Sequence, residues 1–260
     1  SNYRPGSADK LGMDAATLRA LNPRLIYAEL TGFGPVDRRP AFDVVLQAET
    51  GFLHLTGEAD QPPVKMPVAL IDLLAAHQLK EGILLALLRR AESGTGSVVR
   101  TNLYAAALAS LANQATNWLV AGFAPQRMGT AHPNIAPYGD LLLTSDNKYI
   151  VPAVGSDAQF KALCRVLHCS ELAEQPDFAT NAQRIIHRQA LIEQLQSKVR
   201  NWTQADLMEV LLAAKVPAGA LRSIPEVFAQ PEAEKYLRRA KTETGREVTV
   251  VKQVVFELED

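Results

Sequence analysis

The sequence has few cysteines, almost no net charge and no uninterrupted hydrophobic run of membrane-spanning length. Its two cysteines, Cys164 and Cys169, lie five positions apart, which fits neither a disulfide framework nor a zinc site. The formal net charge is −1, so no bulk attraction to nucleic acid or to an anionic membrane is expected. Charged residues interrupt the most apolar long segment, 68–88, which predicts a buried helix. These absences favour a reduced, cytoplasmic protein without a bound metal.

The amino-acid composition along the chain predicts two α/β regions. Its 260 residues suffice for one large or two small domains. Prolines and glycines crowd the stretch between Ala124 and Gly139, which is typical of a linker. We therefore expect a large domain over 1–123, a linker over 124–139, a small α/β domain over 140–230 and a final segment over 231–260.

The first region has the element order of an α/β sheet. A helix stopped by Asn22-Pro23, a strand at 25–30 and a glycine loop at 32–34 follow one another, and a long helix is expected over 67–92. Because ligands bind beyond the carboxyl ends of strands in open α/β sheets, the glycine loop is expected to face a site. In the second region we expect a hairpin of strands at 141–144 and 149–154, helices at 157–167, 187–199 and 203–214, and a β-rich tail at 247–257.

The stretch from Gly94 to Gln114 predicts a strand that runs directly into a helix. The β-like run at 98–103 passes without a turn residue into alanine-rich sequence, which we expect to form a single helix to about Ala121. Unpaired N–H groups at such a helix start stabilise negative charge and suit a nucleophile. The centre of this junction, Asn102 to Ala106, nevertheless carries no nucleophilic side chain.

Four polar motifs are candidates for a binding site, and each also fits an ordinary structural role. The first, 2–6 (NYRPG), is a polar, aromatic and basic loop, or simply a surface turn. The second, 38–43 (RRPAFD), is a pair of arginines before a helix that begins with an acid, or a solvated loop. The third, 132–134 (HPN), is a histidine in the linker, and the fourth is Asp72, a carboxylate inside an apolar helix that is either paired or functional.

Taken together, the motifs resemble one protein family. The resemblance rests on the order of NYRPG at 2–6, NPRLIY at 22–27, GFG at 32–34, RPAFD at 39–43, LTGE at 55–58, AHPNIAPY at 131–138 and KVPAG at 215–219. This series is similar to the class III CoA-transferases, the family of formyl-CoA transferase and the carnitine CaiB/BaiF proteins, over nearly the whole chain. The resemblance implies a Rossmann-like large domain, a small α/β domain and two subunits interlocked as linked rings. Because family chains are longer, we expect a first βαβ unit and a C-terminal return segment to be missing here.

The resemblance also implies a reaction. In the family, a carboxylate attacks the acyl-CoA thioester, an enzyme–CoA thioester forms, and an acceptor acid then takes over the CoA. Aligned without gaps, the carboxylate position at the strand–helix junction falls on Ala105, which cannot attack. Three explanations stay open: an engineered substitution, a natural loss that leaves a CoA-binding protein, or the use of another carboxylate. Asp43 and Asp72 are the alternatives, and we expect neither to sit at the helix start of this junction, facing the same oxyanion donors.

The resemblance assigns contacts residue by residue. Asn2, Tyr3 and Arg4 match the loop that holds CoA, and Lys10 and Arg39 match basic positions suited to its phosphates. His132 and Asn134 are expected at the acyl end of the substrate. The hypotheses are a homodimeric CoA-transferase impaired at Ala105, a non-catalytic acyl-CoA binding protein, and a racemase or dehydratase of the same superfamily. Phe42 stands where the racemase branch has histidine, which disfavours the third. Acyl-CoA and a small carboxylic acid are the expected substrates, with no permanently bound cofactor.

Overall fold

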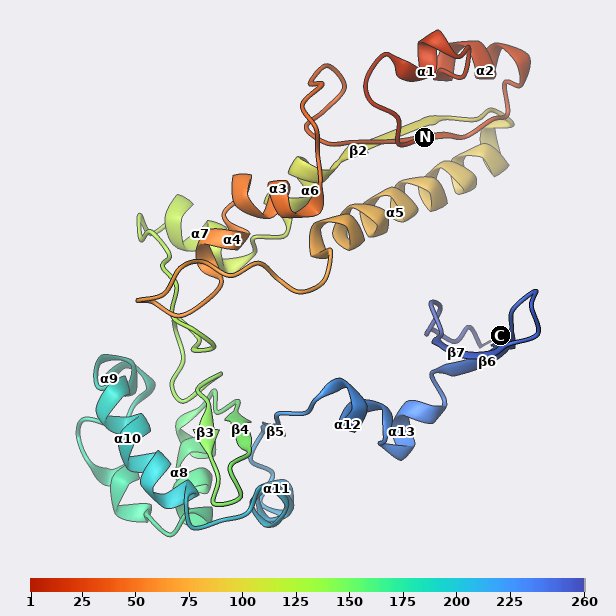
Figure 1. The fold of residues 1–260 in the computed structure, drawn as a ribbon. Helices are drawn as coiled ribbons and strands as arrows, with labels where there is room; N and C mark the ends of the chain where they lie inside the picture. Colours follow the sequence, from red (N-terminus) through yellow and green to blue (C-terminus); the bar gives the residue numbers. More distant parts are fainter. Residues whose placement is uncertain (260) are drawn as a thin grey trace. The chain divides into compact units, whose positions relative to one another are not determined.

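The computed structural model describes residues 1–259, and the chain divides into two compact units between Thr130 and Ala131 (Figure 1). This division falls inside the stretch predicted as a linker. The two-domain limits given above, the Rossmann-like organisation and the interlocked dimer stay predictions. No helix among the described residues is both long and apolar enough to cross a bilayer.

The first unit is built on two parallel strands and one long helix. The strands pair from Tyr27 opposite Val98 to Thr31 opposite Asn102. Gly96 makes this pairing possible, because a Cβ there would lie 1.9 Å from the carbonyl oxygen of Leu25. The elements are α1 (Ser7–Lys10), α2 (Ala15–Leu21), β1 (Tyr27–Thr31), α3 (Asp43–Glu49), α4 (Phe52–Leu55), α5 (Leu70–Ser93), β2 (Val98–Asn102), α6 (Leu103–Ala109) and α7 (Asn113–Leu119).

The predicted strand–helix junction is confirmed, but the single long helix after it is wrong. β2 ends at Asn102 and α6 begins at the next residue. The helix then stops at Ala109, and Ala112, with a φ of 50°, turns the chain before α7 begins. Alanine has a high helix propensity, but a left-handed residue interrupts the helical hydrogen-bond ladder. The core of this unit is small and gathers on α3, α5 and α6: it consists of Leu46, Ile71, Ala75, Leu103, Ala106 and Ala107.

The second unit combines a small antiparallel sheet with a larger helical core. Its strands pair in the order β3-β4-β5, so the predicted hairpin at 141–154 is confirmed with shorter strands. A capping box closed by Ser156 and Gln159 begins α8. The elements are β3 (Leu142–Leu143), β4 (Tyr149–Pro152), α8 (Asp157–Val166), η1 (Ser170–Glu174), α9 (Asn181–Ile186), α10 (Arg188–Val199), α11 (Gln204–Ala213), β5 (Ala218–Ala220), α12 (Ile224–Phe228), α13 (Pro231–Glu234), β6 (Leu237–Lys241) and β7 (Glu247–Val251).

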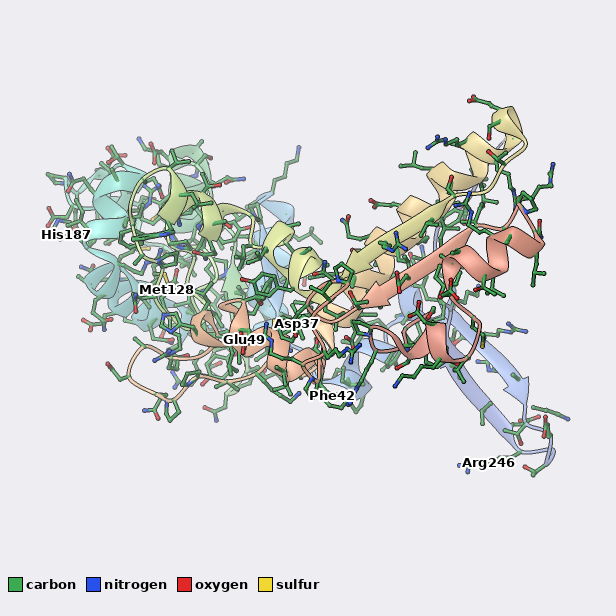
Figure 2. All side chains as sticks on the ribbon, turned by 90° about the horizontal axis from the view of Figure 1, so that it is seen from above. Asp37, Phe42, Glu49, Met128, His187 and Arg246 are labelled. Carbon is green, nitrogen blue, oxygen red and sulfur yellow. The ribbon has the colours of Figure 1, made fainter. Side chains whose placement is uncertain are left out.

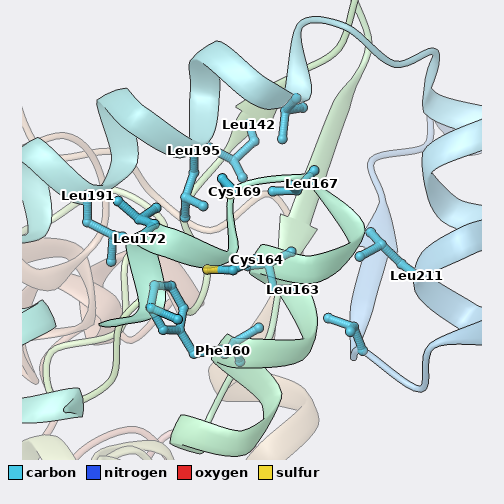
Figure 3. Close-up of a cluster of buried hydrophobic side chains, with 14 of the residues drawn as sticks. Leu142, Phe160, Leu163, Cys164, Leu167, Cys169, Leu172, Leu191, Leu195 and Leu211 are labelled. Atoms are coloured by element: carbon cyan, nitrogen blue, oxygen red, sulfur yellow. The ribbon is translucent and has the colours of Figure 1, made fainter. Parts of the chain in front are cut away.

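The core of the second unit consists mainly of leucines from its helices. Phe160, Leu163, Leu191, Leu195 and Leu211 are almost completely buried and pack together, as Figure 3 shows. The β-rich tail is confirmed over 247–251, where β7 pairs antiparallel with β6. The sequence analysis missed β6, because its run LRRAK lacks the alternation of a half-buried strand.

Candidate functional site

A cavity of about 390 Å³ opens in the first unit, at the carboxyl ends of its two strands. This volume lies in the range of small-molecule sites. The walls come from the N-terminal loop, the end of β1, the loop before α3 and the starts of α5 and α6. The lining residues are Asn2, Tyr3, Arg4, Pro5, Leu30, Thr31, Gly32, Asp37, Arg39, Pro40, Ala41, Phe42, Asp72 and Leu103. Figure 2 labels Asp37 and Phe42 among them.

Four of the five residues predicted to hold CoA meet at this cavity. Asn2, Tyr3, Arg4 and Arg39 all line it, although the first three are far from the fourth in sequence. Lys10, the last residue of α1, is exposed and does not line it. The structure therefore brings together two separate motifs of the sequence and leaves Lys10 outside this group.

The two arginines of the cavity differ in their partners. The Arg39 guanidinium lies over the Phe33 ring at 3.8 Å and pairs with Asp37 at 3.0 Å and with Glu49 at 3.5 Å. The hydrogen bond to Asp37 is the main reason that the pKa of Arg39 is raised. Within the described chain, Arg4 makes no ion pair. Arg4 is therefore the cation of this cavity that is free to bind an anionic group such as a phosphate.

Asp72 is the carboxylate at the cavity that carries no ion pair in the described structure. The expectation that Asp72 lies inside the long helix is confirmed, but the residue is nearer the start of the helix than the expected range implies. The helix begins at Leu70 and not at Pro67, which places Asp72 in its first turn. Partial burial, and secondly the negative charge of Asp43, raise the pKa of the Asp72 carboxyl above its usual value. Asp72 is exposed at the cavity, and a carboxylate in such a position can attack a carbonyl carbon.

Asp43 supports the backbone that carries Asp72. As the first residue of α3, it accepts a hydrogen bond from the backbone N–H of Ile71 at 2.7 Å and another from the Gln47 side chain. Both of its oxygens are thus engaged, and it does not line the cavity. The Ile71 contact fixes the start of α5, and with it the backbone that carries Asp72.

Ala105 lies on the exposed side of α6 and is not among the lining residues. The sequence predicted a row of unpaired N–H groups at the start of α6. Two of these N–H groups instead have hydrogen-bond partners. The N–H of Ala105 donates to the Asn102 side chain at 2.7 Å, and the N–H of Tyr104 donates to the carbonyl of Gly32 at 3.0 Å. Asparagine is a favoured N-cap residue, so this cap was readable from the sequence.

His132 and Asn134 belong to the second unit, where they share one loop. The backbone N–H of Asn134 donates to Nδ1 of His132 at 3.1 Å, and the His132 ring meets the Tyr138 ring edge-on at 5.1 Å. Their assignment to the substrate stays a prediction. No group of three or more potential metal ligands was found among residues 1–259.

Sequence reasoning did not select Asp37 as a lining residue. Its signal was its place two residues before Arg39, since an aspartate often bonds the backbone two residues on. The N–H of Arg39 does donate to the Asp37 carboxylate at 2.9 Å. This bond and the ion pair lower the pKa of Asp37.

Comparisons with known proteins identify the family of this chain. The model of CoA-transferase family III matches residues 1–259. The succinate–glutarate CoA-transferase of Agrobacterium fabrum is 36% identical over 90% of this chain and 58% of its own length, and the acetyl-CoA:oxalate CoA-transferase of Acetobacter aceti is 35% identical over 89% and 60%. The crystal structure of a CaiB/BaiF family protein from Brucella suis superposes with a TM-score of 0.81 at 38% identity, over 98% of this chain and 67% of that one. The chain thus spans about three fifths of the length of these curated relatives, and it belongs to CoA-transferase family III.

Proposed function

We propose that the protein transfers CoA from an acyl-CoA to a carboxylic acid, and that Asp72 is the carboxylate that carries the reaction. The observation behind this proposal is the cavity itself, where Asp72 shares one space with Asn2, Tyr3, Arg4 and Arg39. A basic and polar wall suits the phosphates and amides of CoA. The names of the relatives, which mention succinate, glutarate and oxalate, support dicarboxylic acids as the exchanged acids.

The proposed reaction begins with attack of an Asp72 oxygen on the thioester carbon. The carbon–sulfur bond breaks, CoA leaves as a thiolate, and the acyl group remains on Asp72 as a mixed anhydride. The thiolate then attacks the Asp72 carbonyl carbon and releases the donor acid, so that Asp72 holds CoA as a thioester. The carboxylate of the acceptor acid attacks this thioester, and return of the thiolate to the acceptor's carbonyl carbon restores Asp72.

In this proposal Asp43 is a positioning residue and Ala105 is not the reacting position. Asp43 holds the N–H of Ile71, one residue before Asp72, and its charge helps to raise the pKa of Asp72. The chain is then an active transferase subunit despite Ala105. The competing hypothesis, an enzyme disabled at Ala105 that only binds acyl-CoA, predicts the opposite behaviour of the same variants.

The deciding experiment measures CoA transfer from succinyl-CoA to glutarate and locates the covalent intermediate. We expect Asp72→Asn to lower the rate by about 10⁴-fold and to abolish the hydroxylamine-sensitive adduct, which peptide mass spectrometry places on Asp72 in the unaltered chain. Asp60→Asn, on an exposed loop, is the matched control and keeps full activity. Activity that appears only in Ala105→Asp, with the adduct at position 105, overturns the assignment to Asp72.

The interlocked homodimer is the second part of the proposal and rests on the family resemblance. Light scattering during size-exclusion chromatography tests it, with twice the mass of one chain as the expected result. A monomer that still transfers CoA contradicts the dimer and leaves the assignment of Asp72 standing.

A further inference from the structure

The two cysteines of the chain meet at the turn that ends α8. In this turn His168 has a left-handed backbone, with a φ of 53°. The N–H of His168 donates to the carbonyl of Arg165 at 3.2 Å, and the N–H of Cys169 donates to the carbonyl of Cys164 at 2.8 Å. These two hydrogen bonds define a Schellman motif, in which the residues joined by the longer-range bond commonly bring their side chains into contact. A spacing of five residues, which looks incidental in the sequence, is therefore the spacing of two side chains that meet across a helix end.

The backbone places both cysteines within disulfide range. The hydrogen bond of 2.8 Å keeps the Cα atoms of Cys164 and Cys169 within about 6.7 Å of each other, because covalent geometry fixes the distances from each Cα to the bonded oxygen and nitrogen. Disulfides span Cα separations of about 4.4–6.8 Å. A covalent bond between the two sulfurs is thus compatible with the motif as it stands.

The two thiols differ in how readily they ionise. Both are buried in the core of the second unit, with 0% of Cys164 and 1% of Cys169 exposed (Figure 3). The hydrogen bond between the thiols is the main cause that raises the pKa of Cys164, and the same bond lowers the pKa of Cys169. Because the thiolate is the nucleophile, Cys169 is the thiol expected to react first.

Cys169 is close to the surface of the second unit in spite of its burial. Its two neighbours in sequence, His168 and Ser170, are exposed. A cavity of about 340 Å³ is lined by His168 together with Lys198 and Trp202. Helix ends open locally at a much lower free-energy cost than the whole fold. Opening of this one turn is enough to admit a small oxidant to Cys169.

We propose that Cys164 and Cys169 are a modification site, at which a hydroperoxide converts the two thiols into a reversible disulfide across the end of α8. The Cys169 thiolate attacks a peroxide oxygen, the O–O bond breaks, and the leaving hydroxide takes up a proton to become water. Cys169 is then a sulfenic acid. The Cys164 sulfur attacks the Cys169 sulfur and loses its proton, the S–S bond forms, and the S–O bond breaks with release of a second water. One molecule of hydrogen peroxide is reduced as the two thiols are oxidised, and none of these steps depends on the proposed CoA transfer.

The first test measures the equilibrium between the dithiol and the disulfide in glutathione buffers of defined composition. The chain has no other cysteine, so an intramolecular disulfide can only join this pair. We expect the equilibrium constant for disulfide formation to be about 10- to 100-fold larger in the folded full chain than in the chain unfolded in urea, because the fold holds the sulfurs in contact. Mass spectrometry after alkylation of free thiols measures both. A folded chain with an equilibrium constant equal to or below that of the unfolded chain overturns the proposal.

Substitutions at His168 test the role of the turn. His168→Val opposes the left-handed backbone, because β-branched residues rarely adopt a positive φ, and is expected to lower the equilibrium constant by about tenfold. His168→Gly is the matched control, because glycine adopts this conformation freely and should keep the constant at least as large as in the unaltered chain. Equal constants in the two variants contradict the role of the turn. The comparison of folded and unfolded chains needs no substitution, so it decides even where His168→Val does not fold.

Single cysteine variants test the order of the two steps. Hydrogen peroxide with dimedone, which traps sulfenic acids, is expected to label Cys169 in Cys164→Ser about tenfold faster than Cys164 in Cys169→Ser. The serine hydroxyl in the first variant keeps a hydrogen-bond donor next to Cys169. The unaltered chain is expected to give the disulfide in place of the adduct, with a mass lower by two hydrogens. Faster labelling of Cys164 overturns the assignment of Cys169 as the attacking thiol, and a stable adduct without disulfide in the unaltered chain overturns the pairing.

Discussion

Replacing Gly32 by alanine is expected to displace one wall of the cavity and to slow CoA transfer. A Cβ at this position would lie 2.2 Å from the Cβ of Ala41, whereas ordinary contact begins at 3.4 Å, so the two segments must separate by about 1.2 Å. Both residues line the cavity that also contains Asp72 and Arg39. A displacement of about 1 Å at a reacting site commonly costs on the order of 100-fold in rate. We therefore expect kcat/KM for transfer from succinyl-CoA to glutarate to fall by about 100-fold.

A second substitution separates this displacement from general damage. Ala41→Gly removes the methyl group that clashes, so the double variant is expected to recover to within about tenfold of the original rate. Gly219→Ala, in β5, is the control, since its added Cβ meets no atom within 4 Å. A Gly32→Ala variant with unchanged kinetics, or a double variant as slow as the single one, refutes the argument from steric displacement.

Three further predictions concern stability. Leu195→Ala is expected to lower the free energy of unfolding by about 2–5 kcal/mol, because this leucine is fully buried. Ile186→Ala, at an exposed position, is the control and is expected to change it by less than about 0.5 kcal/mol. Urea titration measures both. Gly96→Ala is expected to lower the free energy of unfolding by about 3 kcal/mol, since the added carbon meets the carbonyl of Leu25. A clearly smaller decrease in the free energy from urea titration contradicts this. Asp72→Asn is expected to stabilise the chain at neutral pH. A carboxyl with a raised folded-state pKa destabilises the fold above that pKa and has no effect below its unfolded value of about 3.9, so the gain must vanish on acidification, and a gain that persists at low pH contradicts this assignment.

The sequence predicted the strand–helix junction, the hairpin of the second unit and most of its helices, because each carries a local signal. Ser156 caps α8, a β-rich run precedes α6, and turn residues separate β3 from β4. Such signals depend only on neighbouring residues. The break at Ala112 has no local signal, since alanine favours a helix and rarely adopts a positive φ.

The candidate site was predicted in its parts but not in its assembly. Asn2, Tyr3, Arg4 and Arg39 were selected from motifs, and the structure places them around one cavity. Asp72 was selected as a candidate carboxylate, but its place in the first turn of α5 could not be read from the pattern, because that place depends on where α5 begins. That start is fixed by a contact between residues 28 positions apart, from the N–H of Ile71 to Asp43. Contacts at such separations are set by tertiary structure and leave no periodicity in the sequence.

The unequal hydrophobic cores have a consequence for how the protein responds to heat. Among the described residues, eighteen are buried in the core cluster of the second unit and six in that of the first. Residues that share one buried core unfold together, so each unit is expected to unfold as a separate cooperative transition. Calorimetry is therefore expected to resolve two endotherms, with the first unit melting at the lower temperature. The cavity with Asp72 belongs to this less stable unit, so CoA is expected to move the lower endotherm upward and to leave the upper one in place. The melting temperature of the second unit then serves as an internal reference for measuring how much a ligand stabilises the first unit.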